Sequence, residues 1–244
     1  MHTAGETPKI LLGIATLNPD RRFLESLQPF VKEVTERKIA DLHFKWVWNE
    51  RLVDAQNIIA DKFLSFPDFD YLLFLEDDHF DFKAEMLESC LNAANHVTAI
   101  PYRSRHFPFE MIPMRFEKID SNGVRRFTGL NHKSGNHESD LCGFGFTLIH
   151  RSVFEILEKP YFRLNNEYYK GVGCHATDID FCFRVQSAGL KIIGNFDYVL
   201  PHRDLNEDAY KELKVSGALV KHSMFTHIRR LVEGRKREHV LKEV

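Results

Sequence analysis

The sequence predicts an α/β domain built around one central sheet. Short apolar runs alternate along the chain with segments of helical periodicity, an order typical of helices layered on a sheet. The run at 71–75 is uninterrupted, as in a strand buried on both faces, and it ends at three consecutive carboxylates. A length of 244 residues with 43% hydrophobic content suits one large core. We therefore expect a mixed, mostly parallel sheet flanked by helices.

The first half of the chain alternates strand and helix. Residues 9–17 read as a buried strand, and Pro19 and Asp20 lead into a helix. Residues 42–48 alternate and are rich in aromatics, which predicts a second strand before a helix at 51–64. The expected inward faces of these two helices are Phe23, Leu24, Leu27, Phe30 and Val31, and then Leu52, Ala55, Ile58, Ile59 and Phe63.

The second half is more varied. After the acid-tipped strand we expect a helix at 84–95 and a strand at 96–102. Residues 103–137 read as a strand pair with long loops. The remaining expected elements are a strand and helix in 140–157, a helix in 177–192 that stops at Gly189 and runs into a strand, and a closing segment at 198–204. Residues 1–204 then form the main domain, and 205–244 a basic helical extension packed on it.

Composition narrows the functional classes. A formal net charge of −2 argues against general attraction to nucleic acid. No run is apolar enough to span a bilayer, and the first residues lack the apolar core of a signal peptide, so we expect a cytoplasmic protein. The four cysteines show no C-x-x-C spacing, which favours reduced thiols over a zinc site.

The carboxylates Glu76, Asp77 and Asp78 are the strongest functional signal. They follow a buried strand, and open α/β sheets bind ligands at the carboxyl ends of their strands. Clustered carboxylates repel one another unless a cation lies between them. Strand alternation places Glu76 and Asp78 on one side, which suits a hard divalent ion. The alternative is a polar turn that caps the next helix.

Several motifs together resemble the GT-A class of nucleotide-sugar glycosyltransferases. The resemblance covers nearly all of residues 9–204 and departs from the family pattern at Glu76, Gln56 and Thr177. It is carried, in order, by ATLN at 15–18, DAQN at 54–57, FLEDDHF at 74–80, GFGFTLIHRSVFE at 143–155 and TDIDFCFRVQSAGLKI at 177–192. It implies a GT-A, Rossmann-like domain that uses a nucleoside-diphosphate sugar.

The resemblance also implies a metal site and a catalytic base. Asp78 is the expected direct ligand of Mn²⁺ (or Mg²⁺), with Glu76 beside it and His202 as a third ligand. Asp178 is the expected base that takes the proton of the acceptor hydroxyl. The competing interpretations are a structural histidine at 202 and a helix-capping acid at 178. Inverting and retaining chemistry both remain open.

Donor contacts are expected at the ends of the first strands and on the second helix. The candidates are Thr16, Asn18, Arg51, Gln56, Asn57, Glu76 and Asp77, although residues of these types also cap helices or remain solvated. The acceptor is open: glycan, protein or nucleic acid. Residues 103–109 and 125–127 interleave cations with aromatics, which suits a stacked or anionic acceptor but is more often a solvated loop. The basic tail offers a possible peripheral contact with a membrane surface.

Two other functions compete with glycosyl transfer. A metal-dependent nucleotidyltransferase uses a similar sheet and acid pair, but the chain has no G-x-x-x-x-G-K-[ST] loop. A non-catalytic nucleotide- or glycan-binding module is the other alternative. A binding module has no need of Asp78, Asp178 and His202 together, so this combination favours an enzyme.

Overall fold

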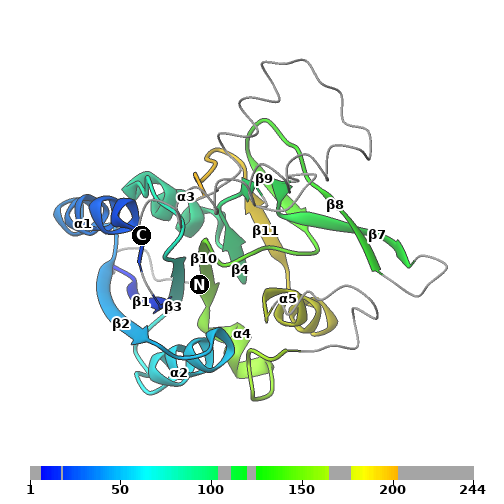
Figure 1. Ribbon diagram of the computed structural model, residues 1–244, viewed down its shortest axis with the longest axis horizontal. Helices are drawn as coiled ribbons and strands as arrows, with labels where there is room; N and C mark the ends of the chain where they lie inside the picture. The colour runs from blue at the N-terminus through cyan, green and yellow to red at the C-terminus, as the bar shows by residue number, and fades with distance from the viewer. Residues whose placement is uncertain (1–6, 18, 104–110, 120–124, 165–176, 203–244) are drawn as a thin grey trace, which may run out of the picture. The chain divides into compact units, whose positions relative to one another are not determined.

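The computed structural model describes residues 7–17, 19–103, 111–119, 125–164 and 177–202. By its contacts the chain divides into Met1–Arg203 and Asp204–Val244, and every described residue belongs to the first unit. That unit is a three-layer α/β structure, with helices on both faces of a central sheet (Figure 1). The α/β class and the mixed sheet predicted from the sequence are confirmed.

The central sheet has seven strands in the order β2-β1-β3-β10-β4-β11-β9. Their bounds are β1 Lys9–Thr16, β2 Asp41–Trp48, β3 Tyr71–Glu76, β4 Val97–Ala99, β9 Asn136–Ser139, β10 Phe146–His150 and β11 Ile192–Asn195. The strands β1, β2 and β3 pair in parallel, as do β4 and β11, whereas β10 and β9 run antiparallel to their neighbours. Because β10 lies antiparallel between β3 and β4, its first residue meets the carboxyl end of β3.

In the described part of the chain, five helices cover the two faces of the sheet. They are α1 Arg21–Glu36, α2 Leu52–Leu64, α3 Ala84–Ala93, α4 Arg151–Ile156 and α5 Thr177–Ser187. In Figure 1, α1 and α3 lie on one side of the sheet, and α2, α4 and α5 lie on the other. Two buried clusters fill the layers between sheet and helices, and β3 supplies both by alternation: Leu72 and Phe74 join one cluster, and Leu73 and Leu75 join the other.

The predicted inward faces need three corrections. Leu24 on α1 is 46% exposed, and Leu52 and Ile58 on α2 are 47% and 40% exposed. In their place α2 buries Gln56 and Ala60 beside Ala55, Ile59 and Phe63. The apolar stripe read from the sequence was too wide, because a helix that packs on a sheet buries only the stripe that faces it.

The segment predicted as one strand at 96–102 is interrupted. The strand β4 ends at Ala99, and Pro101 separates it from β5 Tyr102–Arg103, because proline has no N–H for a central ladder. The strand β5 pairs with β6 Met111–Ile112, and β7 Met114–Ile119 pairs with β8 Arg125–Gly129, as expected for a strand pair. None of the described helices is long and apolar enough to cross a membrane. The predicted tail at 205–244 lies outside the described residues.

Candidate functional site

The candidate site forms where β3 ends. The strand β3 is buried along Tyr71–Leu75 and stops at Glu76, after which a turn carries Asp77 and Asp78 and leads to His79. Asp78 is 7% exposed and His79 is fully buried. Because the strand is fixed between β1 and β10, the turn holds these polar side chains at the carboxyl edge of the sheet.

A second segment reaches this edge from far along the sequence. After β11, the backbone N–H of Leu200 donates to the carbonyl of Pro101 over 2.8 Å, and His202 forms an isolated antiparallel bridge with His79. The His202 side chain is 7% exposed. The two imidazole rings stack with centroids 4.5 Å apart and an interplanar angle of 3°.

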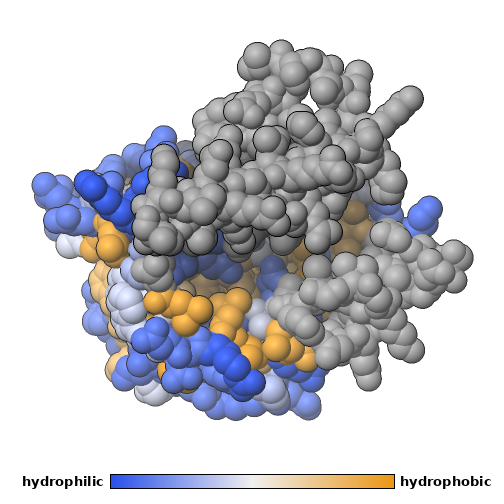
Figure 2. Space-filling view, viewed as in Figure 1, coloured by the Kyte–Doolittle hydropathy of each residue, from blue (hydrophilic) through white to orange (hydrophobic). Residues whose placement is uncertain are grey.

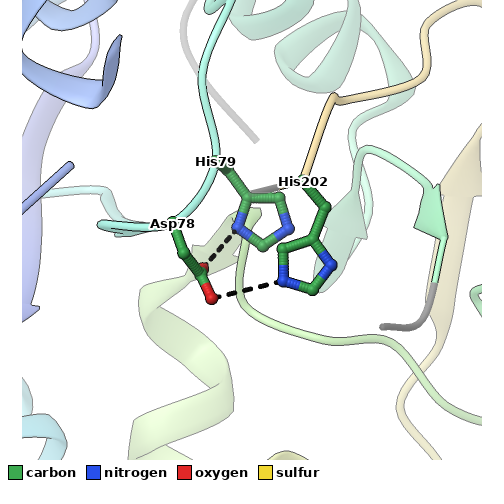
Figure 3. Close-up of side chains that lie close together, drawn as sticks. All are labelled: Asp78, His79 and His202. Carbon is green, nitrogen blue, oxygen red and sulfur yellow. Dashed lines mark hydrogen bonds and ion pairs between the residues drawn. The ribbon is translucent and has the colours of Figure 1, made fainter. Parts of the chain in front are cut away.

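Asp78, His79 and His202 form one cluster of possible metal ligands, the metal triad (Figure 3). Asp78 Oδ1 lies 3.1 Å from His79 Nδ1, and Asp78 Oδ2 lies 3.2 Å from His202 Nε2. One ligand atom from each of the three residues lies within 4.8 Å of the others. The carboxylate therefore faces one nitrogen of each imidazole.

The hydrogen bonding of His202 calls for a positive charge beside Asp78, either on the imidazole ring itself or on a bound ion. Its Nδ1 lies 3.0 Å from the carbonyl oxygen of Arg103, which can only accept, so Nδ1 carries the proton. In the neutral ring Nε2 then presents a lone pair to the Asp78 carboxylate. Two lone pairs at this distance repel unless the imidazole is protonated or a metal ion lies between them. A carbonyl that fixes the distal ring nitrogen is also the usual support of a metal-binding histidine.

Asp78 is kept ionised in this setting. Burial alone would raise the pKa of its carboxyl, but hydrogen bonds from His202 and His79, with the charges of those rings, hold the pKa well below its usual range. Asp78 is therefore a carboxylate throughout the physiological pH range. An ionised carboxylate and two imidazoles make a mixed oxygen and nitrogen donor set, which fits a divalent transition metal.

Two glycines before β10 make room for the triad. A Cβ on Gly145 would lie 2.7 Å from His79 Nε2, and a Cβ on Gly143 would lie 1.8 Å from the hydroxyl oxygen of Tyr102. The Tyr102 ring in turn meets His79 edge-on, at a centroid distance of 4.4 Å. At both glycines the lack of a side chain therefore lets another protein side chain approach the backbone.

Asp178 lies in the first turn of α5 and is half-buried. Burial raises the pKa of its carboxyl to about 6, although backbone N–H groups, including that of Ile179 at 2.9 Å, lower it. Burial and the negative charges of Glu76, Asp178 and Asp78 together raise the pKa of Tyr102 well above its ordinary value. Asp178 and the end of β3 therefore act electrostatically on the same buried phenol.

Thr16 and Asp77 are brought together beside the triad. The Thr16 hydroxyl donates a short hydrogen bond to Asp77 Oδ2, which ties the end of β1 to the turn after β3. Glu76 lies on the other side of that turn, with its Oε2 3.9 Å from His79 Nδ1. These two acids therefore flank Asp78 without belonging to the cluster of three. Their predicted donor or metal roles remain predictions.

The other predicted donor residues occupy different environments. Arg51 is exposed and pairs with Asp54 over 2.6 Å. Gln56 is buried on α2, and its Oε1 has no hydrogen-bond partner among the described residues. Asn57 donates to the carbonyl of Phe162 over 2.7 Å and accepts from the N–H of the same residue over 3.1 Å. Asn18 lies outside the described residues.

Sequence reasoning missed His79 as a possible ligand. The histidine directly follows the acidic run, so a search for any metal-ligating residue within the turn would have included it. Strand alternation was applied beyond Glu76, where the chain has already left the strand. The conformation of the turn after Glu76, and not the alternation of the strand, determines that the side chains of Asp78 and His79 lie together.

Solved structures that are similar to most of the chain include the following two. A197 from STIV matches at 16% sequence identity and a TM-score of 0.51, covering 80% of this chain and 85% of that one. GalNAc-T7 with UDP, GalNAc and Mn²⁺ matches at 14% identity and a TM-score of 0.52, covering 82% of this chain and 44% of that one. The chain therefore spans less than half the length of GalNAc-T7. These likenesses confirm the GT-A-like fold predicted from the sequence.

No protein-family model and no curated protein sequence matches the chain. The likeness is thus one of fold.

Proposed function

We propose that the protein is a metal-dependent glycosyltransferase that moves a sugar from a nucleoside-diphosphate sugar to an acceptor hydroxyl. The observation that carries the proposal is the convergence of Asp78, His79 and His202 at the carboxyl end of β3. The three residues come from segments separated by 124 positions, and they are buried and face one another. A buried carboxylate needs a positive charge close by, and a divalent ion bound by all three side chains would supply it.

The metal triad would hold a divalent ion against the donor's diphosphate. Such an ion stabilises the negative charge that the leaving diphosphate gains. The two imidazoles favour manganese over magnesium, which prefers oxygen ligands. The role of the chain is to fix three ligands in a largely buried place, with the Arg103 carbonyl orienting His202 and Gly145 leaving space for His79.

Asp178 is the proposed acceptor-side base. A pKa of about 6 leaves most of the carboxyl ionised at neutral pH, yet makes it a stronger base than a free aspartate. Asp180 is not an equivalent candidate, because it is 1% exposed and bonded to Arg163 Nε over 2.8 Å. Asp178 would accept the proton of the acceptor hydroxyl as that oxygen attacks the sugar.

The first donor class to test is UDP-sugars. GalNAc-T7, whose fold the chain shares, carries UDP, GalNAc and Mn²⁺ in its solved structure. The test then extends to a panel of nucleoside diphosphates and their sugars.

The deciding experiment measures thermal stabilisation by each nucleotide, with and without Mn²⁺, and then release of nucleoside diphosphate from the matching sugar donor. We expect one nucleotide to stabilise the protein only with metal, and Asp78→Ala to lose both that shift and turnover. Asp61→Ala is the matched control, because Asp61 is an exposed acid that pairs with Lys159. Full metal-dependent turnover in Asp78→Ala would refute the assignment of Asp78 as a metal ligand. Pyrophosphate release from a nucleoside triphosphate would instead indicate a nucleotidyltransferase.

A further inference from the structure

The chain has two tryptophans, and they stack on each other at the end of β2. The rings of Trp46 and Trp48 lie 5.6 Å apart between centroids, with an interplanar angle of 13°. The ring of Phe23 on α1 packs edge-on against Trp46, with a distance of 6.0 Å between ring centroids. Trp48 remains 51% exposed although it is a large aromatic side chain. Stacking on Trp46 thus fixes the plane of the Trp48 indole, and about half of the Trp48 side chain remains accessible to solvent.

The position of this pair relates it to the metal triad. The strand β2 is an edge strand, and Figure 2 shows hydrophobic surface along the border of the molecule where β2 runs in Figure 1. Trp48 is the register partner of Thr16, and Thr16 donates to Asp77 beside the triad. Since β1 separates β2 from β3, Trp48 lies about two strand spacings, about 10 Å, from the end of β3.

We propose that Trp48 is the stacking platform for the nucleobase of the donor. This inference rests on the proposed function, because it places the base relative to a diphosphate at the triad. A nucleoside diphosphate extends far enough to join the two places along the carboxyl edge of the sheet. Every base has a π-face, so an indole platform gives affinity to all of them and little discrimination.

Phe44 shows why exposure alone does not make a platform. It lies on the same face of β2 and is 42% exposed, but it precedes Trp48 by four residues. That spacing puts it about 13 Å further from the carboxyl edge. Phe44 is therefore a matched control: an exposed aromatic on the same strand that a nucleotide at the triad does not reach.

Intrinsic fluorescence tests the platform directly, because both tryptophans of the chain belong to it. The wild-type protein is titrated with UDP, GDP, ADP and CDP in the presence of Mn²⁺, and with inorganic pyrophosphate as a probe without a base. We expect saturable quenching by the diphosphates that bind and none by pyrophosphate. Calorimetry then compares affinities in Trp48→Ala, Trp48→Phe and Phe44→Ala.

The expected result is a loss of about 5- to 150-fold in nucleotide affinity for Trp48→Ala, the range for one stacked base. Pyrophosphate affinity should stay unchanged in that variant, Trp48→Phe should recover most of the loss, and Phe44→Ala should match wild type. Equal nucleotide affinity in wild type and Trp48→Ala would overturn the platform and leave the proposed function standing. The platform would also be overturned if Trp48→Ala lost as much affinity for pyrophosphate as for nucleotide, or if Phe44→Ala weakened nucleotide binding equally. Fluorescence quenching by free monosaccharides alone would overturn it as well. Failure of every nucleotide to bind wild type would overturn both proposals.

Discussion

At the residue scale, Asp178 has an environment that should be visible in the pH dependence of activity. Its pKa of about 6 lies near the working pH of a general base, and the acid is uncharged below that value. We expect kcat to fall tenfold per pH unit below about pH 6, and Asp178→Asn to lower kcat by about 10²- to 10⁴-fold with little change in nucleotide affinity. A pH profile that is flat between 5 and 7 would remove Asp178 from the mechanism.

The same raised pKa predicts a change in stability. A carboxyl whose folded pKa exceeds its unfolded value binds its proton more tightly when folded, so its contribution to stability falls as pH rises from about 4 to about 6. Asp178→Asn should therefore be more stable than wild type at pH 7.5, by about 1–3 kcal/mol. The advantage should vanish below about pH 4, which urea unfolding at the two pH values would check. A less stable variant at pH 7.5 would mean that the ionised carboxyl is compensated.

A substitution at Gly145 tests the metal triad without replacing any of its three residues. A Cβ there would meet the His79 ring at 2.7 Å, so Gly145→Ala should displace the imidazole and weaken Mn²⁺ binding by about 10- to 100-fold. The control is Gly189→Ala, which is strained by its φ of +75° but places the new methyl group more than 4 Å from every other described residue outside its immediate neighbours. That variant should lose folding stability and keep its metal affinity. Equal metal affinity in both variants would remove His79 from the ligand set.

The candidate site was only partly predictable at this scale. The sequence singled out Asp78 and His202 because acids at a strand end and a histidine after the last strand resemble a known arrangement. The structure brings the two side chains within 3.2 Å, and their role as metal ligands stays a prediction. His79 was missed because its inward direction depends on the turn after Glu76 and on the absence of a side chain at Gly145. This steric requirement involves Gly145 and His79, which are 66 positions apart, so it cannot be predicted from a local sequence pattern.

At the element scale, Asn57 joins α2 to the chain after α4. Both functional atoms of its amide bond to the backbone of Phe162, and its nitrogen also donates to Val53. Removing the amide would leave a backbone N–H and carbonyl without their partner. We expect Asn57→Ala to lower the free energy of unfolding by about 1–3 kcal/mol, measured in urea, with nucleotide affinity unchanged. Weaker nucleotide binding at unchanged stability would support the sequence-based donor role instead.

The order of elements was readable from the sequence, but their pairing was not. Apolar periodicity located the strands and helices from β1 to α3 within a few residues. Nothing local indicates that the strand at Phe146–His150 runs antiparallel between β3 and β4, since a strand buried on both faces looks the same in either direction. Likewise Leu52 and Ile58 read as buried because periodicity gives the direction of the apolar stripe better than its width.

At the scale of the whole molecule, the metal triad joins the turn after β3 to the segment that follows β11. His202 is held to the turn after β3 by a backbone bridge and by Asp78, across 124 positions. A metal bound to these residues would link the segment that follows β11 to the central sheet. Because it would bind the folded state only, its binding energy would add to folding stability.

Metal removal should therefore destabilise the entire domain. At a Mn²⁺ concentration 100 times its dissociation constant, we expect a gain of about 2.7 kcal/mol over the metal-free protein, seen as a higher midpoint in thermal unfolding and reversed by a chelator. His202→Ala should abolish the gain, because it removes one ligand and the imidazole that stacks on His79. His43→Ala is the control, since that histidine is exposed and pairs with Asp41 outside the triad. If the unfolding midpoint rises equally with Mn²⁺ in wild type and in His202→Ala, the ion binds elsewhere. The turn after β3 and the segment after β11 would then be held together without a metal ion.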